Sequence, residues 1–191
     1  EDYYPKPYLE LMAAIHYIRT NNDRLRTFKD KITLLGFSAG GHLSASYPLI
    51  EKDMELRNIL GFKDEDLKPN SLILGYPVLD FITYHHSQTK FKMTHNDSSL
   101  INKLTVPQNV RKDYPPTFIW TTDNDDLVPS MNTYLMIEAL KKNNIKYADK
   151  IYPYGRHGLS IGNKALNPNV DIQKENVLGW IDLADEFIRN L

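Results

Sequence analysis

The chain has 191 residues, and 41% of them are hydrophobic, which is enough to bury the core of one domain. Its 23 basic and 24 acidic residues give a net charge of −1, so the charge pattern favours neither nucleic acid nor an anionic membrane as a partner. It contains no cysteine, which excludes disulfides and thiolate metal ligands.

The sequence shows no apolar run near the roughly 18 residues that a membrane-spanning helix needs. The first ten residues, EDYYPKPYLE, have neither the basic start nor the apolar segment of a signal peptide. We therefore expect a soluble chain without a membrane partner, and we take the cytoplasm as the default location.

Helical and extended patterns alternate along the chain. Strands are predicted for four short apolar segments, residues 31–37, 71–78, 116–122 and 146–154. Helices are predicted for residues 8–20, 41–52 and 130–143 and for the apolar stripe from Val177 to Ile188. This alternation predicts a single α/β domain over residues 1–191, with a mostly parallel sheet and right-handed crossovers.

The segment from Asp80 to Pro116 interrupts this alternation with a long polar excursion between two predicted strands. Connections of this length carry function or form small helices of their own, and the alternative is a disordered loop. We expect a partly helical, cap-like insertion at about 80–116, over the carboxyl edge of the sheet.

The sequence GFSAG at residues 36–40 matches the G-x-S-x-G pattern and lies between a predicted strand and a predicted helix. On such a sharp turn the serine has a strained backbone, and the flanking glycines make room where side chains would meet the neighbouring strand or helix. Ser38 is the candidate nucleophile, and the Ala39 amide is the candidate donor to an oxyanion. The alternative is a glycine-rich turn that joins strand to helix or holds a phosphate.

A nucleophilic serine needs a general base, and six histidines compete for this role. In the fold that carries this turn, the order along the chain is Ser, then Asp or Glu, then His, and each partner follows a strand. His157 meets both conditions, since it follows the strand predicted at 146–154 and lies between Gly155 and Gly158. His42, on the helix after the serine, is the reserve base.

The remaining histidines have simpler interpretations. His16 lies on the first predicted helix, and His85, His86 and His95 lie in the polar excursion, where solvated loop residues are expected. A metal site made by these last three is the alternative, but they show neither an i,i+4 pair nor a suitable carboxylate spacing. We therefore predict no metal.

The acid is expected in TTDNDDLVP, residues 121–129, directly after the third predicted strand. Asp123, Asp125 and Asp126 compete, and three carboxylates so close together cannot all be buried and charged without a large mutual cost. We expect one of them to act in catalysis and the others to be solvated or to cap the backbone.

Three segments together resemble a known family. DKITLLGFSAGGHLSAS, YPPTFIWTTDNDDLVP and YPYGRHGL are similar, in this order, to the nucleophile, acid and histidine segments of small α/β-hydrolase esterases of the acetyl-xylan-esterase-like and acetyl-esterase/lipase group. In that group the acid stands four residues before the proline of a D-x-x-V-P-like turn, which implies Asp125, with Asp126 in reserve.

The resemblance covers nearly the whole chain and implies an α/β-hydrolase fold with a catalytic triad of Ser38, Asp125 and His157. It implies hydrolysis of short-chain, acetyl-like carboxylic esters, with acetylated sugars as small-molecule substrates. The reaction would proceed through an acyl-enzyme without a cofactor.

Esterases of this group also have an upstream H-G-G-G-like loop that supplies a second oxyanion donor, and this chain has no such motif. We expect the chain to be the C-terminal two-thirds of a longer hydrolase, lacking its N-terminal strands, or another polypeptide segment to complete the sheet. The run ITLL at 32–35 is typical of a strand covered on both faces and paired at both edges, so one of its edges would then be open.

Without the second donor, the isolated chain is expected to turn over esters about 10²–10³ more slowly. Two alternatives to an esterase stay open: a serine peptidase similar to the prolyl-oligopeptidase type, and a non-catalytic fragment or binding module that keeps the triad. The sequence specifies no oligomeric state.

Overall fold

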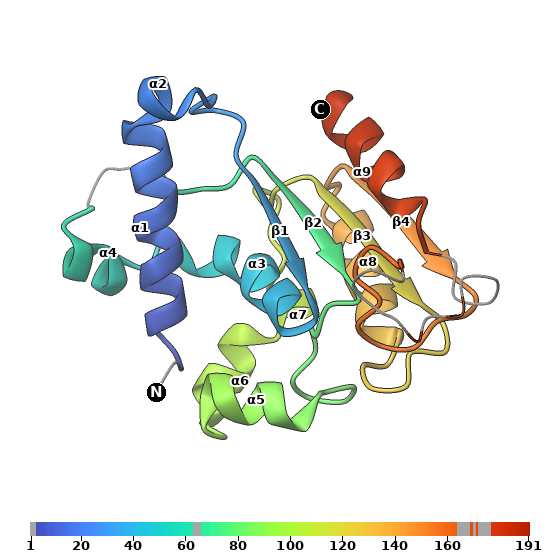
Figure 1. Cartoon of the computed structure of the whole chain (residues 1–191). Helices are drawn as coiled ribbons and strands as arrows, with labels where there is room; N and C mark the ends of the chain where they lie inside the picture. Colours follow the sequence, from blue (N-terminus) through green and yellow to red (C-terminus); the bar gives the residue numbers. More distant parts are fainter. Residues whose placement is uncertain (1–2, 63–65, 164–168, 170, 172–176) are drawn as a thin grey trace.

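The strands form one parallel sheet in the order of the chain. The computed structural model describes residues 3–62, 66–163, 169, 171 and 177–191. Within these ranges the strands pair in the order β1-β2-β3-β4 (Figure 1). Their bounds are Thr33–Phe37 for β1, Ser71–Gly75 for β2, Thr117–Thr122 for β3 and Tyr147–Tyr152 for β4. The predicted parallel sheet is confirmed, and all its strands end at the same edge.

Helices connect the strands and cover the sheet. They are α1 (Lys6–Thr20), α2 (Asn22–Leu25), α3 (Ser38–Ile50), α4 (Met54–Leu60), α5 (Ser87–Thr94), α6 (Ser98–Leu104), α7 (Val106–Asn109), α8 (Met131–Lys142) and α9 (Trp180–Arg189). Over the described ranges, none of them combines the length and the apolar character that a crossing of the bilayer requires.

The strand predicted at 71–78 ends early, at Gly75. Tyr76 has a φ of +35°, which leaves the extended region, and Pro77 has no N–H for a strand ladder. The apolar character of the next residues reflects burial in a connecting segment rather than a longer strand.

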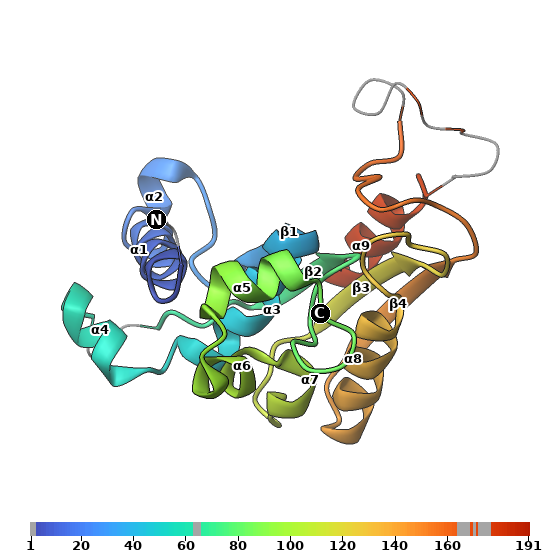
Figure 2. The same ribbon diagram turned by 90° about the horizontal axis from the view of Figure 1, so that it is seen from below.

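Two apolar clusters pack against the two faces of the sheet. Side chains alternate along β2, so Leu72 and Leu74 lie in the cluster with α3 and α8, whereas Ile73 lies in the cluster with α9. In this second cluster Trp120 of β3 packs with Trp180 of α9. The view along the sheet shows α9 on one side of the strands and α8 on the other (Figure 2).

A third apolar cluster holds α1 against α3. Its members from α1 are Tyr8, Met12 and Ile15, all of which are buried. The Tyr8 hydroxyl is 2.7 Å from the Ser46 hydroxyl of α3. The helix predicted at residues 8–20 is therefore confirmed, and it forms a layer outside α3.

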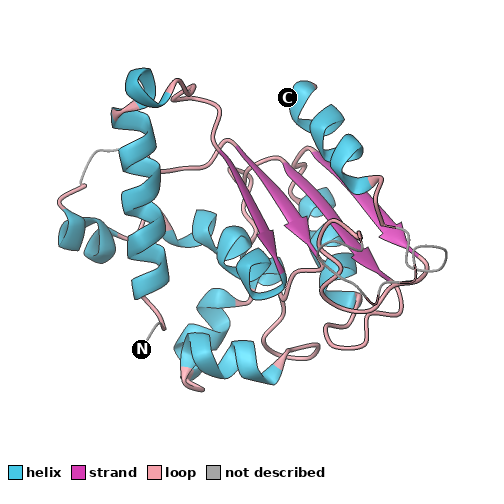
Figure 3. Ribbon diagram, in the orientation of Figure 1, coloured by secondary structure: helices cyan, strands magenta, loops and turns pink. Residues whose placement is uncertain are grey.

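Strand β1 lies at one end of the row of strands (Figure 3). Among the described strands it pairs with β2 alone, and the side chain of Leu35 is 49% exposed. Burial on both faces, which the apolar run at 32–35 indicated, is therefore not found for Leu35 in the described chain. The physical reason is the position of β1, which has a neighbouring strand on one side.

The excursion at 80–116 contains α5, α6 and α7, which confirms a partly helical segment. Lys103 places its amine 2.8 Å from both Asp53 Oδ2 and the Tyr4 hydroxyl, which ties α6 to the N-terminal part of the chain. Helices α5 and α6 lie near the end of the sheet toward which the strands point (Figure 1). The role of this segment as a cap over the site stays a prediction.

Candidate active site

Ser38 lies on a sharp turn between β1 and α3, at the carboxyl edge of the sheet. Its φ is +52°, a left-handed value that residues other than glycine rarely adopt. A Cβ atom at Gly36 would lie 2.2 Å from the Gly40 carbonyl oxygen and 2.6 Å from the Ser44 hydroxyl oxygen. Glycine at position 36 therefore lets the strand approach the first turn of α3, as the sequence predicted.

The glycine after the serine behaves differently. A Cβ atom at Gly40 would meet no heavy atom of the described chain within 4 Å, so the prediction that both flanking glycines prevent a collision is wrong for Gly40. A Cβ atom at Gly41 would instead lie 2.8 Å from Pro77 Cβ. Gly36 and Gly41 are therefore the glycines that permit close approach around the turn.

Two hydrogen bonds join Ser38, His157 and Asp125. The Ser38 hydroxyl oxygen is 2.7 Å from His157 Nε2, and His157 Nδ1 is 2.8 Å from Asp125 Oδ2. Because a carboxylate can only accept, Nδ1 of the neutral ring carries the proton and Nε2 accepts from the serine hydroxyl. The side chains of His157 and Asp125 are 12% and 1% exposed. The structure thus brings together the three residues that the sequence singled out.

Each of the three competing aspartates has a different partner. Asp125 Oδ1 accepts from two backbone N–H groups of the turn that follows. This arrangement points Asp125 Oδ2 toward the ring of His157. Asp126 Oδ1 accepts from the backbone N–H of His157 at 2.8 Å. Asp123 Oδ1 accepts from the Tyr134 hydroxyl. The reserve acid Asp126 therefore contacts the backbone of the histidine rather than its ring.

The loop that carries His157 is tied to the end of β3. The Thr122 hydroxyl donates to the Gly155 carbonyl at 2.6 Å, and the Gly155 N–H donates to Asn124 Oδ1 at 2.8 Å. A Cβ atom at Gly155 would lie 2.7 Å from Thr122 Cγ2, so a larger residue does not fit. Gly158 has a φ of +82°, which completes the tight loop around the histidine.

Tyr76 is a site residue that the sequence analysis did not single out. Its ring centroid lies 4.9 Å from that of His157, and its hydroxyl accepts from the Ser160 N–H at 3.0 Å. Burial raises the pKa of the Tyr76 hydroxyl and the charge of Asp125 adds to this, so the hydroxyl stays protonated. Tyr76 directly follows the carboxyl end of a parallel strand, and binding sites in such sheets lie at this edge. This position in the sequence could have marked Tyr76 as a site residue.

The reserve base His42 is completely buried on α3. Its Nδ1 is 2.9 Å from the Val78 carbonyl, and its ring stacks on Phe81 with centroids 4.3 Å apart. Its Nε2 is buried and has no hydrogen-bond partner within the described part of the chain. Burial lowers the pKa of His42 to about 4, despite the opposing effect of the bond to Val78. This histidine is therefore a neutral part of the core.

The histidines of the excursion have local partners. His86 places Nδ1 2.8 Å from the Thr89 hydroxyl at the start of α5, and His95 stacks on Tyr3. The Ser87 hydroxyl lies 3.4 Å from His85 Nδ1. Within the ranges that the structure describes, no three His, Cys, Asp or Glu side chains are grouped so that they could hold a metal ion.

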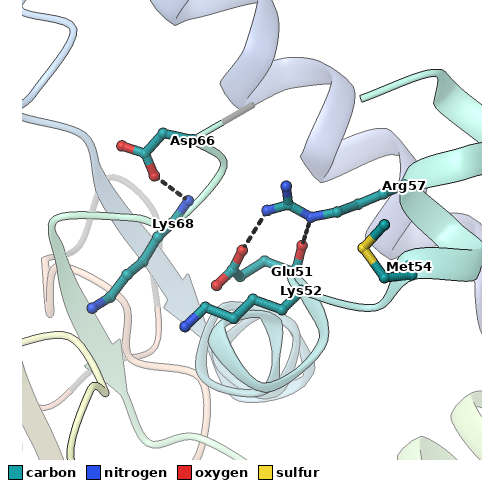
Figure 4. A pocket seen from close by; sticks show the side chains of 6 residues that line it. All are labelled: Glu51, Lys52, Met54, Arg57, Asp66 and Lys68. Carbon is teal, nitrogen blue, oxygen red and sulfur yellow. Dashed lines mark hydrogen bonds and ion pairs between the residues drawn. The ribbon is translucent and has the colours of Figure 1, made fainter. Parts of the chain in front are cut away.

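A surface cavity of about 330 Å³ lies near the opposite end of α3 from Ser38 (Figure 4). Its lining residues are Glu51, Lys52, Met54, Arg57, Asp66 and Lys68. Glu51 follows the last residue of α3, about 20 Å along the helix from Ser38. Glu51 and Arg57 form a buried ion pair at 2.8 Å, so these charges satisfy each other. This cavity is separate from the candidate active site.

The fold and the site define a class of protein. A parallel sheet with helices on both faces, and a serine on a strained strand-to-helix turn followed along the chain by an aspartate and a histidine, are the features of the α/β-hydrolase fold. Residues 1–140 match the model of the BD-FAE family, and the chain belongs to this family. The resemblance to α/β-hydrolase esterases that the sequence indicated is confirmed.

The chain is similar to known enzymes of carbohydrate and ester hydrolysis. Endo-1,4-beta-xylanase B of Butyrivibrio fibrisolvens is 31% identical over 161 residues, which are 83% of this chain and 25% of that protein. Acetylxylan esterase of Xylanibacter ruminicola is 30% identical over 138 residues, which are 69% of this chain and 26% of that protein. The chain therefore spans about a quarter of the length of these curated relatives.

A solved structure is similar in fold over nearly the whole chain. The crystal structure of an acetyl ester-xyloside bifunctional hydrolase from Caldicellulosiruptor lactoaceticus matches with a TM-score of 0.79 at 27% sequence identity. The match covers 99% of this chain and 67% of that one. The α/β-hydrolase fold expected from the sequence is thus found in a solved relative.

Proposed function

We propose that this chain carries the catalytic residues of a carboxylic ester hydrolase that cleaves short-chain, acetyl-like esters through an acyl-enzyme. The observation that carries the proposal is the hydrogen-bonded series from Ser38 through His157 to Asp125, at 2.7 and 2.8 Å. A serine hydroxyl is a weak nucleophile until an adjacent base, itself oriented by a third group, accepts its proton. Membership of the BD-FAE family and the esterase relatives support the same class of reaction.

In the acylation step, Ser38 Oγ attacks the carbonyl carbon of the ester while His157 Nε2 accepts the serine proton. Asp125 holds the imidazole in the required tautomer and stabilises the imidazolium that forms. When the tetrahedral intermediate collapses, the bond from carbon to the alcohol oxygen breaks and His157 gives its proton to the leaving alcohol. The acyl group is then an ester of Ser38.

Deacylation repeats the same proton transfers with water. Water attacks the acyl carbon, His157 accepts its proton, and the acid is released as Ser38 recovers its hydrogen. In both steps the negative oxygen of the intermediate faces the first turn of α3. There the Ala39 amide is a suitable donor, because the first amides of a helix have no carbonyl partner within it. A second oxyanion donor, and the slower turnover expected without it, stay predictions.

Acetylated sugars are the proposed substrate class. The support comes from a relative named as an acetylxylan esterase and from a solved relative named as an acetyl ester-xyloside bifunctional hydrolase. A net charge of −1 agrees with an uncharged substrate, since no strong field is needed to attract it.

Covalent labelling tests the nucleophile directly. The chain is expected to react with a fluorophosphonate at Ser38 and to hydrolyse p-nitrophenyl acetate. Ser38→Ala is expected to lose the label and to lower kcat by about 10⁴-fold or more, because the three residues act as a unit. Ser99→Ala, at an exposed serine of α6, is the matched control and is expected to keep both. Labelling of Ser38→Ala at the level of the unmodified chain would contradict the assignment.

The same preparation separates the esterase from the alternatives. Hydrolysis of p-nitrophenyl acetate without cleavage of a proline-containing peptide supports the proposal. Peptide cleavage with little ester hydrolysis would favour a serine peptidase instead. A chain that is neither labelled nor active would favour a binding module.

A further inference from the structure

Two aromatic side chains hold the backbone of Ser160, three residues after His157. The Ser160 N–H donates to the Tyr76 hydroxyl at 3.0 Å, and its carbonyl accepts from Trp180 Nε1 at 2.9 Å. Ser160 has a φ of +53°, a strained value for a residue with a side chain. Such a conformation persists only where the surroundings fix it, so these two bonds explain the path of the chain after the histidine.

Tyr76 joins this backbone to the imidazole. Its ring meets the ring of His157 edge-on, with centroids 4.9 Å apart and planes at 74°. Its other neighbours are Phe37, stacked at 5.5 Å, and Trp120, edge-on at 5.0 Å. Tyr76 is 5% exposed and has a strained φ of +35°. The Tyr76 ring is therefore packed on several sides and contacts the imidazole from a fixed position.

The segment that carries Tyr76 is also bonded to the nucleophile turn. The Val78 N–H donates to the Ser38 carbonyl at 3.2 Å. The Val78 carbonyl accepts from His42 Nδ1, on the same helix as Ser38, at 2.9 Å. Residues 76–78 thus contact the backbone of the nucleophile at one end and the base at the other.

We propose that Tyr76 is a positioning residue that holds His157 within hydrogen-bond reach of Ser38. Its ring supports the imidazole, and its hydroxyl fixes the following chain through Ser160. The inference rests on the proposed function, in which His157 Nε2 accepts the Ser38 proton. A misplacement of reacting groups by about 1 Å can lower the rate by about 10²-fold. A side chain that keeps the imidazole in place is therefore expected to raise kcat.

Three substitutions test the proposal on the full chain. Tyr76→Phe removes the hydroxyl and keeps the ring, whereas Tyr76→Leu removes both. The matched control is Tyr152→Phe in the same aromatic cluster, since the buried Tyr152 hydroxyl has no hydrogen-bond partner in the described chain. With p-nitrophenyl acetate, kcat is expected to fall about tenfold in Tyr76→Phe and about 10²-fold in Tyr76→Leu. KM is expected to stay unchanged in Tyr76→Phe, and Tyr152→Phe is expected to leave both constants unchanged.

A second readout needs no ester turnover. The proton on His157 Nδ1, bonded to Asp125 at 2.8 Å, is expected to give a far-downfield proton NMR signal that disappears in His157→Ala. This signal is expected to persist in Tyr152→Phe and to shift or broaden in Tyr76→Phe, because the imidazole is then less firmly held.

The outcomes separate positioning from a structural role. An unchanged kcat and an unchanged proton signal in Tyr76→Phe, together with a lower Tm, would overturn the proposal. Absence of the signal from the unmodified chain would overturn it as well, because the imidazole would not be fixed. If the unmodified chain shows the signal but hydrolyses no ester, the proposed function fails, and the response of the signal to Tyr76→Phe still decides the role of Tyr76.

Discussion

The two sides of the candidate site are held in different ways. On the nucleophile side, Ser38 lies on a turn fixed by the close approach of backbone atoms, with Gly36 against the carbonyl of Gly40. On the histidine side, the loop at 155–160 is held by hydrogen bonds from side chains of other segments, at both of its ends and at His157 itself.

This difference determines how each side responds to substitution. Close backbone packing leaves no room for an added atom, so a change on the nucleophile side acts through the stability of the whole turn. Side-chain hydrogen bonds can be removed singly, each with a modest effect on stability. We therefore expect single substitutions on the histidine side to lower activity by different amounts. On the nucleophile side we expect a substitution that adds atoms to close backbone packing to destabilise the fold.

Among the substitutions that leave Ser38 in place, the largest effect is expected on the histidine side, at the hydrogen bond between Asp125 and the His157 ring. Asp125→Asn is expected to lower kcat on p-nitrophenyl acetate by about 10⁴-fold, because an amide no longer selects the imidazole tautomer that accepts the serine proton. Asp126→Asn is the matched control, and it weakens only the bond to the His157 backbone, with an expected loss of about tenfold. The reverse order of these two losses would move the role of the acid to Asp126.

The nucleophile side is tested by its two glycines. Gly36→Ala is expected to lower the free energy of unfolding by about 3 kcal/mol, because its methyl group would overlap the Gly40 carbonyl and the Ser44 side chain. Gly40→Ala is expected to leave this free energy unchanged or to raise it by up to about 1 kcal/mol, since alanine favours the helix. Urea unfolding followed by circular dichroism measures both. Equal destabilisation by the two substitutions would show that packing at Gly36 does not fix the turn.

The smallest effect is expected on the free energy of unfolding in acid, where His42, in the core next to the nucleophile turn, affects stability. His42 has a pKa of about 4 in the folded chain, below the ordinary value near 6.5 of the unfolded chain. The unfolded chain therefore binds the proton first as the pH falls, and stability declines from about pH 6.5 until the change is complete near pH 4. Between pH 7 and pH 5 this histidine is expected to remove about 2 kcal/mol from the free energy of unfolding.

His42→Asn isolates this contribution, because the asparagine amide can still donate to the Val78 carbonyl but does not titrate. Its free energy of unfolding is expected to fall by about 2 kcal/mol less than that of the unmodified chain between the same two pH values. An equally steep decline in the variant would show that other groups cause the loss of stability in acid.

Local sequence patterns, together with the resemblance to the esterase group, predicted the sheet and the three central residues of the site. Buried parallel strands read as short apolar runs, and the strand-to-helix context of GFSAG located Ser38 without any knowledge of contacts. The order of residues along the chain then indicated His157 and three competing aspartates after the third strand, and the resemblance to the esterase group implied Asp125 among them. The prediction of the sheet succeeded because the pattern of a buried strand lies within a few residues, and the structure places Ser38, His157 and Asp125 within hydrogen-bond distance of one another.

Features that depend on distant contacts were not predicted. Tyr76 bonds to Ser160, 84 residues away, and no local pattern marks such a pair. An open edge beside β1 was expected, but the half-exposed Leu35 was expected to be buried, because its apolar neighbours do not reveal which face of the strand other elements cover. Gly40 fits the sequence pattern as well as Gly36 does, but in the fold only Gly36 is packed closely against other atoms.

The aromatic cluster behind His157 also gives the protein an internal fluorescent reporter. The chain has two tryptophans, Trp120 and Trp180, and both lie in this cluster with stacked rings 5.5 Å apart. Both rings also contact Phe37, directly before Ser38, so selective excitation of tryptophan observes the packing beneath both sides of the site, while far-ultraviolet circular dichroism observes the helices of the whole chain. Coincident unfolding curves from the two probes would mean that both sides of the site belong to one cooperative unit. Separate curves would mean that the aromatic cluster loses its packing while helices elsewhere in the chain stay folded.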